Sequence, residues 1–260
     1  MKAFKIIQVN IYKGKYLEDL LEFLINEDPD FISMQEVTTY RFNLYRRKSS
    51  NMFNLIRRRL KMHGVYNGDL KLKDNRRSLF GNAVFSKYKI IDSNVVVLKT
   101  FKPVTIKELD GVDGAVRTQI DRHLLDALID FDSQPIHVMS WHGAWTAPPQ
   151  DTVETLRQAK KVADYIKSLK QPFILGCDAN NVLESKTIGL INNVAINLMI
   201  GRDIVQTTHP KVHKIAPKGF LVDYVFTSIH FKLKSLMVPQ MLVSDHLPVV
   251  AELEIKTNFF

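Results

Sequence analysis

Short apolar segments that carry a polar side chain at one end recur along the chain, and this pattern limits the fold more than any other feature. FKIIQVNIY (residues 4–12) contains Asn10, and DFISMQEV (residues 30–37) runs into Gln35 and Glu36. Alternating or continuous apolar runs of this length are typical of β-strands. Between them, residues 16–28 place leucines at helical spacing with acids in the first turn. Strand and helix therefore alternate, which favours a layered α/β or α+β domain with sheet at its centre.

The rest of the chain continues the pattern. We predict helices over residues 51–64 and 151–170, and strands over residues 81–90, 94–101, 135–141, 172–177, 220–228 and 249–255. VRTQIDRHLLDALIDF (residues 116–131) fits either a helix or a pair of strands. We find no repeat and no linker, so we expect one domain over residues 1–260.

The charge of the chain favours an anionic partner. It has 36 Lys and Arg against 27 Asp and Glu, a net charge of +9, and residues 40–64 are densely basic. Such a segment attracts nucleic acid or an anionic membrane surface, although it is also what a solvated helix face looks like. No stretch approaches the length of a membrane span and the start reads as a strand. The single cysteine, Cys177, excludes an internal disulfide, so we expect a cytoplasmic protein.

Polar residues stand at the ends of many of the predicted strands. One polar residue at a strand end is commonly a turn or helix cap, but nine in this arrangement are difficult to treat as independent caps. They predict a site at one edge of the central sheet. Besides Asn10, Gln35 and Glu36, the residues are His142, Asp178, Asn180, Asp223, Asp245 and His246.

The donor types favour a hard cation. Carboxylate and amide oxygens suit Mg²⁺ or Mn²⁺, and the lone Cys177 has no CxxC partner, which argues against zinc. GxxxxGKS, GxGxxG and GxSxG are all absent from the sequence, so nucleotide-cradling and serine-hydrolase functions lose their usual support.

Seven segments together resemble the endonuclease/exonuclease/phosphatase superfamily. They are QVN, MQEV, GNAVFSKYKI, SWHGAW, ILGCDANNV, LVDYVFTS and VSDHLPVV, in that order and at roughly the superfamily's spacing, over nearly the whole chain. The resemblance implies a DNase I-like four-layer α/β sandwich, in which two mainly antiparallel sheets pack face to face between helices. It also implies a metal-dependent phosphoric ester hydrolase.

The resemblance assigns a role to each metal-site residue. Glu36 resembles the main Mg²⁺ ligand, and Asn10 and Asp245 resemble the residues that complete or support the metal site. Mn²⁺ is the expected substitute. Buried carboxylates are costly unless they are paired or bind a cation, so an ion at Asp245 would explain an acid beside so apolar a strand.

The catalytic residues follow from the same resemblance. Asp178 and Asn180 resemble the pair that orients the attacking water and the scissile phosphate. His246 resembles the histidine that works with Asp223 at the phosphate, and His142 resembles a second histidine that contacts the phosphate or the leaving group. An aspartate beside His246 would fix its tautomer and raise its pKa. Which group is the formal base stays open.

Some positions depart from the family pattern. Val9 and Tyr12 differ from the residues common in AP endonucleases, and Cys177 lies within the usual Gly-Asp-x-Asn motif. These differences and His142 weaken an assignment to the AP-endonuclease branch. No expected metal ligand is lost.

Three further residues are predicted to contact substrate. Arg117 can bind phosphate, Asn82 can line the cleft, and His209 can approach substrate from a loop. Each has an ordinary structural alternative: a surface ion pair, a turn amide and a loop histidine. Trp141 and Trp145 can stack on a base, although core packing is the stronger expectation for Trp141.

We therefore predict a Mg²⁺-dependent phosphodiesterase, most simply a nuclease or DNA-end-processing enzyme that acts as a monomer on nucleic acid. The alternative is a phosphodiesterase or phosphatase for lipid or inositol phosphates, on which the same basic segment would meet anionic headgroups. A catalytically dead binding module is a third class, disfavoured because no catalytic residue is lost. Residues 99–117 and 183–219 are the expected substrate-choosing loops, and they contain no known motif.

Overall fold

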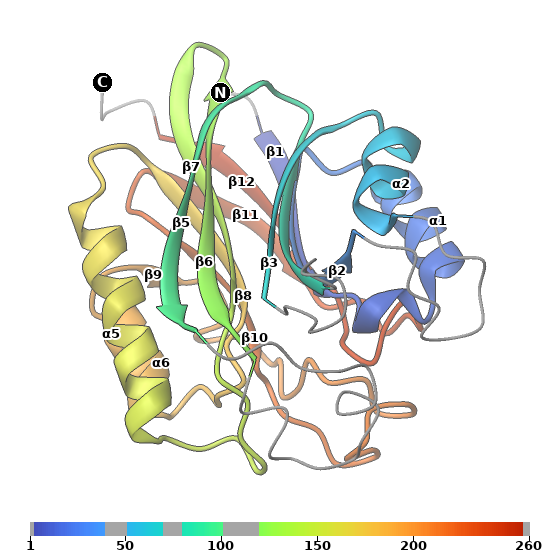
Figure 1. Cartoon of the computed structure of the whole chain (residues 1–260), viewed down its shortest axis with the longest axis vertical. Coiled ribbons are helices and arrows are strands. Elements are labelled where there is room, and N and C mark those ends of the chain that lie inside the picture. Colours follow the sequence, from blue (N-terminus) through green and yellow to red (C-terminus); the bar gives the residue numbers. More distant parts are fainter. Residues whose placement is uncertain (1–2, 40–50, 70–79, 101–119, 257–260) are drawn as a thin grey trace.

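Two six-stranded sheets form the centre of the molecule (Figure 1). The structure, a computed structural model, describes residues 3–39, 51–69, 80–100 and 120–256. The first sheet has the order β11 (Phe231–Met237), β12 (Val249–Ile255), β1 (Ala3–Asn10), β2 (Phe31–Thr38), β4 (Phe80–Ser86) and β3 (His63–Gly68). The second has the order β5 (Ile90–Lys99), β6 (Arg122–Phe131), β7 (Gln134–His142), β8 (Phe173–Asp178), β10 (Asp223–Thr227) and β9 (Ile196–Asn197).

Helices cover the outer faces of both sheets. Figure 1 shows α1 (Leu17–Glu27) and α2 (Met52–Arg59) beside the first sheet, and α5 (Val153–Ser168) and α6 (Lys186–Asn192) beside the second. The resulting helix, sheet, sheet, helix order confirms the predicted four-layer α/β sandwich of the DNase I-like type. Among the described residues, no helix is both long and apolar enough to cross a membrane.

Each sheet contains one parallel pair among antiparallel neighbours, so both sheets are mixed. β1 pairs in parallel with β2 and β7 with β8, which brings Asn10 beside Gln35 and His142 beside Asp178. β10 runs antiparallel to β8, and its first residue, Asp223, pairs with Asp178. The carboxyl ends of both parallel pairs and the start of β10 therefore supply the polar residues of one sheet edge.

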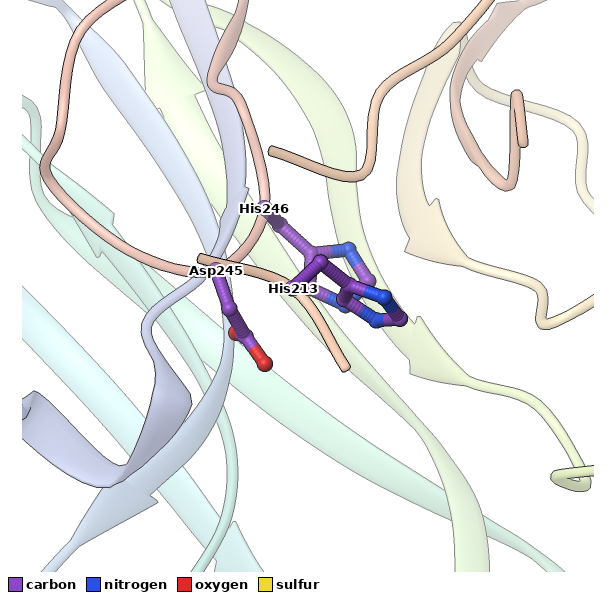
Figure 2. Close-up of side chains that lie close together, drawn as sticks. All are labelled: His213, Asp245 and His246. Carbon is purple, nitrogen blue, oxygen red and sulfur yellow. The ribbon is translucent and has the colours of Figure 1, made fainter. Parts of the chain in front are cut away.

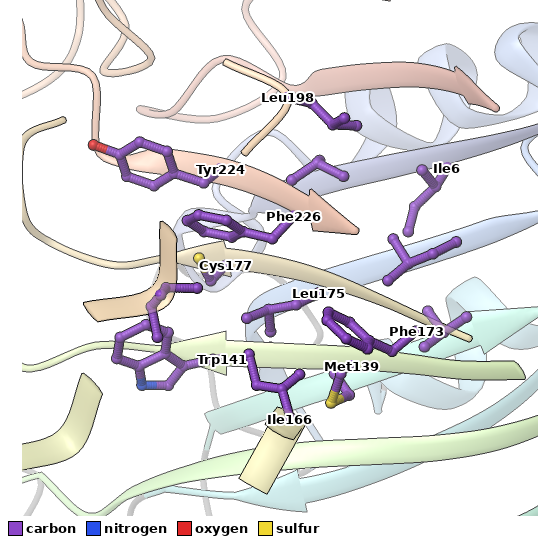
Figure 3. Close-up of a cluster of buried hydrophobic side chains, with 14 of the residues drawn as sticks. Ile6, Met139, Trp141, Ile166, Phe173, Leu175, Cys177, Leu198, Tyr224 and Phe226 are labelled. Carbon is purple, nitrogen blue, oxygen red and sulfur yellow. The ribbon is translucent and has the colours of Figure 1, made fainter. Parts of the chain in front are cut away.

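The core fills the space between the sheets and continues beneath α5. Figure 3 shows this cluster, in which β7, β8 and β10 contribute Trp141, Leu175 and Phe226, and Ile166 comes from α5. The two sheets approach closely at Gly176, because a Cβ built there would lie 2.6 Å from Ser33 Oγ. Ser33 Oγ instead donates to the Gly176 carbonyl at 3.0 Å. Glycine at this position thus allows the sheets to touch through backbone.

The structure resolves the described part of the ambiguous segment and corrects several predicted boundaries, among them those of α2 and β4. Residues 122–131 form strand β6 rather than a helix, because their apolar side chains are buried on both faces of the second sheet. The helix predicted over residues 51–64 ends at Arg59; Lys61 adopts φ 55°, which stops the helix before β3 begins. The strand predicted over residues 81–90 ends at Ser86, where Tyr88 N donates to Ser86 Oγ in a turn that leads into β5.

Strand β3 and helix α6 were not predicted. β3 is short, half-buried and rich in glycine, so it lacks the alternation that marks a strand. α6 begins at a Ser185 side-chain cap to Ile188 N at 3.2 Å. That cap is a recognisable start signal, but the helix has only 7 residues.

Candidate active site

Asp178, the last residue of β8, is the centre of a buried polar cluster. Its Oδ2 accepts a hydrogen bond from Asn10 Nδ2 at 2.9 Å and lies 3.5 Å from His142 Nε2 and 3.8 Å from His246 Nε2. Its Oδ1 accepts the backbone N–H of Asn180 at 3.0 Å. Four residues predicted from separate segments therefore meet around one carboxylate. The structure brings this part of the predicted site together.

His246 forms a second contact, to Asp223. His246 Nδ1 lies 2.8 Å from Asp223 Oδ2, and both side chains are buried. Gln8 Nε2 donates to the other carboxylate oxygen at 3.4 Å. With its Nδ1 directed at Asp223, the imidazole keeps Nε2 for the cavity. Asp223 thus fixes both the tautomer and the orientation of His246.

The two histidines differ in charge. Burial opposes protonation of His246, but Asp223 and Asp178 outweigh burial and hold the pKa of His246 well above its usual value. For His142, burial and the positive charges of Arg122 and His246 act in the same direction, so its pKa lies well below the usual value. These shifts favour the imidazolium form of His246 and the neutral form of His142.

Asp178 has an unusual acidity for a carboxylate. Its pKa is raised to about 6: burial and the negative charge of Asp223 raise it, and the positive charge of His246 and the hydrogen bonds from Asn10 and Asn180 offset only part of this increase. An acid with this pKa is largely ionised at neutral pH but is still basic enough to accept a proton. This is the property expected of a group that activates water.

Glu36 and Asp245 provide further oxygen donors at the same edge. Glu36 lies at an irregularity of β2 and adopts φ 59°, which departs from strand geometry, and its Oε2 lies 3.1 Å from Lys13 Nζ. Burial opposes ionisation of Glu36, but Lys13, His246 and Arg122 together lower its pKa. Burial raises the pKa of Asp245, and the negative charge of Glu36 adds to this increase. Two carboxylates that repel each other in a buried cleft favour a cation between them.

The described residues also contain two groups of His and Asp whose ligand atoms lie within 4.8 Å of one another. One group is Asp178, Asp223 and His246; the other is His213, Asp245 and His246 (Figure 2). Either group could hold a divalent metal only with the His246 imidazole in its neutral form. They share His246 and differ from the predicted ligand set of Asn10, Glu36 and Asp245.

A cavity of about 460 Å³ opens onto this cluster. All but one of the predicted catalytic and metal-site residues line it, and the exception, Asp223, lies behind His246. The volume is in the range of ligand-binding clefts and exceeds what a single phosphate group needs. Its other walls include Tyr12, Lys13, Arg122, Trp145, Pro148, His213, Lys214, Lys218 and Phe220.

Two of the three predicted substrate contacts, Asn82 and His209, do not line the cavity. Asn82 is fully buried between the sheets, where its Nδ2 donates to the His123 carbonyl at 3.1 Å, and it does not line the cavity. His209 is 5% exposed, and its Nδ1 accepts the Lys211 N–H. Arg117 lies outside the described residues. Trp141 is in the core, whereas Trp145 lines the cavity.

Arg122 and His213 line the cavity and were not predicted. Arg122 is the first residue of β6 and only 4% exposed, and its Nη1 lies 4.0 Å from Asp69 Oδ2. The signal for Arg122 was present, since a charged residue again stands at the end of an apolar run. His213 gave no such signal, because its position depends on how residues 207–220 close on the site.

Comparison with solved structures supports the fold. The endonuclease/exonuclease/phosphatase from Bacteroides vulgatus superposes with a TM-score of 0.75 and 18% identity, covering 98% of this chain and 100% of that one. D. rerio TDP2 in complex with a single-strand DNA product superposes with a TM-score of 0.70 and 17% identity, covering 98% of this chain and 100% of that one. The Bacteroides thetaiotaomicron mannosyl-6-phosphatase superposes with a TM-score of 0.71 and 14% identity, covering 97% of this chain and 100% of that one.

Sequence comparison identifies the family. No curated protein matches the chain. The Endonuclease/Exonuclease/phosphatase family matches residues 7–246, which include each predicted catalytic and metal-site residue. This chain therefore belongs to the endonuclease/exonuclease/phosphatase family.

Proposed function

We propose that this protein is a Mg²⁺-dependent phosphodiesterase that hydrolyses phosphodiester bonds in nucleic acid, with DNA as the first substrate to test and Mn²⁺ as a substitute metal. The observation that carries the proposal is the convergence of Asn10, His142 and His246 on the Asp178 carboxylate in one cavity. This arrangement offers a base, a cationic donor and a neutral donor within reach of one reacting group.

Glu36, Asp245 and the amide oxygen of Asn10 would hold the metal. Carboxylate and amide oxygens are the donors that Mg²⁺ prefers, and all three residues line the cavity. When bound, the ion neutralises phosphate oxygens and stabilises the departing oxygen. Family membership and the buried Asp and His cluster support a divalent metal in general.

The side chains themselves account for the remaining chemistry. The imidazolium of His246 donates its Nε2–H to a phosphate oxygen, and Asp223 keeps the ring in that orientation. Asp178, with its pKa of about 6, accepts the proton of the attacking water. Arg122, buried at the cavity wall, adds a fixed positive charge for the phosphate.

A nucleic acid substrate is supported by charge and by one relative. The net charge is +9, and the last turn of α2 exposes Arg57, Arg58 and Arg59. D. rerio TDP2, which shares the fold, is described in complex with single-strand DNA. We propose in addition that the protein acts as a monomer and that its location is cytoplasmic.

A small phosphoester is the second candidate substrate. The mannosyl-6-phosphatase has the same fold, with a TM-score close to that of D. rerio TDP2. A cavity of about 460 Å³ is large enough for a sugar phosphate. Lipid and inositol phosphates belong to the same class of alternative.

The test is nicking of supercoiled plasmid in Mg²⁺ and in EDTA by the wild type, His246→Ala and His63→Ala. His63 is exposed on β3 and does not line the cavity, so its variant is the matched control. Nicking that needs Mg²⁺ and His246 but not His63 is expected. If the plasmid stays intact while mannose 6-phosphate, inositol phosphates or sphingomyelin is hydrolysed, nucleic acid is not the substrate and the smaller phosphoester is.

A further inference from the structure

The segment from residue 207 to 222 lines one side of the cavity. Hydrogen bonds hold it to the residues on either side of His246. His209 N donates to the Asp245 carbonyl at 2.8 Å, and Leu247 N donates to the Thr207 carbonyl at 2.6 Å. At the other end, Asp223 N donates to Thr207 Oγ1 at 3.0 Å. The start of the segment is thus fixed to the two residues that flank His246, and Thr207 also joins it to Asp223, which follows the end of the segment.

A compact turn within the segment brings His213 against His246. His213 N donates to the His209 carbonyl at 3.1 Å, and Ala216 N donates to the His213 carbonyl at 2.9 Å. The ring centroids of His213 and His246 are 5.5 Å apart and the rings are nearly perpendicular. Figure 2 shows the two side chains close together. The turn therefore has a defined position beside the catalytic histidine. The backbone that follows His213 is therefore also held close to His246.

Two of those side chains are lysines that line the cavity. Lys214 and Lys218 are exposed and belong to its wall, whereas Lys211, also exposed and on the same segment, does not line it. Residues 207–222 contain no Asp or Glu. Within the described residues, the acids that line the cavity are Glu36, Asp178 and Asp245, all in the catalytic cluster. The cavity is thus acidic where the metal would bind and basic on the wall beyond it.

We infer that Lys214 and Lys218 form a subsite for a second phosphate of the substrate, adjacent to the one that is cleaved. This inference rests on the proposed function and narrows it to strands in which a phosphate flanks the scissile bond. The catalytic cluster already supplies His246 and Arg122 for the reacting phosphate, so two further cations on a fixed wall match an additional anion. A cavity of about 460 Å³ has room for both groups.

Two matched pairs of chromogenic substrates test the subsite. One pair is thymidine 5′-(p-nitrophenyl phosphate) with and without a 3′-phosphate, and the other is thymidine 3′-(p-nitrophenyl phosphate) with and without a 5′-phosphate. The wild type should prefer the phosphorylated member of one pair by about tenfold in kcat/KM, as expected for two cations on one phosphate. The double variant Lys214→Ala/Lys218→Ala should reduce this preference to about twofold, and Lys211→Ala should keep it.

A binding measurement makes the test independent of turnover. Thymidine 3′,5′-bisphosphate should bind the wild type and Lys211→Ala more tightly than either thymidine monophosphate, and this difference should disappear in the double variant. No preference for the second phosphate in the wild type, or an equal loss in Lys211→Ala, would overturn the subsite. If none of the four esters is hydrolysed, the proposed function fails, while bisphosphate binding still decides whether the subsite exists.

Discussion

His246 Nδ1 lies 2.8 Å from Asp223 Oδ2, and the same spacing separates His137 Nδ1 from Asp126 Oδ2, on two strands of the sheet that contains Asp223. Only the first pair adjoins the cavity; neither His137 nor Asp126 lines it. Within the described residues there are therefore two Asp–His pairs with this spacing, one beside the Asp178 cluster and one away from it. The second pair is an internal control for the first.

Asp223→Asn should inactivate the enzyme without unfolding it. The substitution removes the negative charge that holds the pKa of His246 well above its usual value, so that pKa should fall and the imidazolium should be lost at neutral pH. We expect kcat to drop by about 100-fold or more, as for other residues that orient a catalytic histidine. NMR titration of His246 and steady-state kinetics measure the two effects. Asp126→Asn should leave kcat nearly unchanged, and an equal loss in both variants would contradict the assignment.

The pair of Asp126 and His137 should make stability depend on pH. Burial lowers the pKa of His137, but hydrogen bonding and the charge of Asp126 outweigh burial and raise it. The pair should therefore stabilise the fold fully below the unfolded pKa of about 6.5, and this contribution should disappear as the pH rises through the higher folded pKa. Urea denaturation between about pH 5 and 9 should show a loss of about 1 kcal/mol that is absent in His137→Asn. The same slope in that variant would exclude the pair as its source.

Asp245→Asn should weaken metal binding and stabilise the metal-free protein. Because burial and Glu36 raise the pKa of Asp245, its ionised form is unfavourable in the folded protein without a cation. Removal of the charge should raise the Tm in EDTA by a few degrees, and should abolish the increase in Tm that MgCl₂ gives the wild type. Thermal melts in EDTA and in MgCl₂ measure both. An unchanged Mg²⁺ effect in Asp245→Asn would remove Asp245 from the metal site.

Gly176→Ala should destabilise the contact between the two sheets. The added Cβ would lie 2.5 Å from Ser33 Cβ and 2.8 Å from Gln8 Oε1, so the sheets must separate or rotate. We expect a loss of about 1–3 kcal/mol in the free energy of unfolding. Gly189→Ala is the control, because its Cβ would meet nothing within 4 Å and alanine favours the helix by about 1 kcal/mol. A neutral Gly176→Ala would show that the sheet contact tolerates an extra methyl group.

The sequence was sufficient to predict the layers and the sheet edge that carries the site. Asn10, Asp178 and His246 stand next to apolar runs, and a strand that is buried along its length leaves its polar residue at the end. Parallel pairing of β1 with β2 and of β7 with β8 then brings such ends together. These relationships depend on local pattern and on strand order. The local pattern could be inferred from the sequence and the layers followed from the resemblance to the family, whereas the strand order was not predicted.

Contacts between distant segments could not be predicted. β6 was ambiguous because HLLDALIDF fits helical and strand periods equally well, and only pairing on both sides makes it a strand. The contact of Asp69 with Arg122 joins residues 53 positions apart that share no motif. His213 reaches His246 through a turn without a sequence signature. Asn82 belongs to a motif of the family, but the structure buries it between the sheets.

We propose that Asp178 and its neighbours form a metal-dependent phosphodiesterase site. The most direct test is the kcat/KM for bis(p-nitrophenyl) phosphate in Mg²⁺, compared between the wild type, Asp178→Asn and Asp126→Asn. We predict hydrolysis that EDTA abolishes, a loss of about 1,000-fold in Asp178→Asn, as expected for removal of a general base and its charge, and little change in Asp126→Asn. Wild-type activity in Asp178→Asn would contradict this prediction.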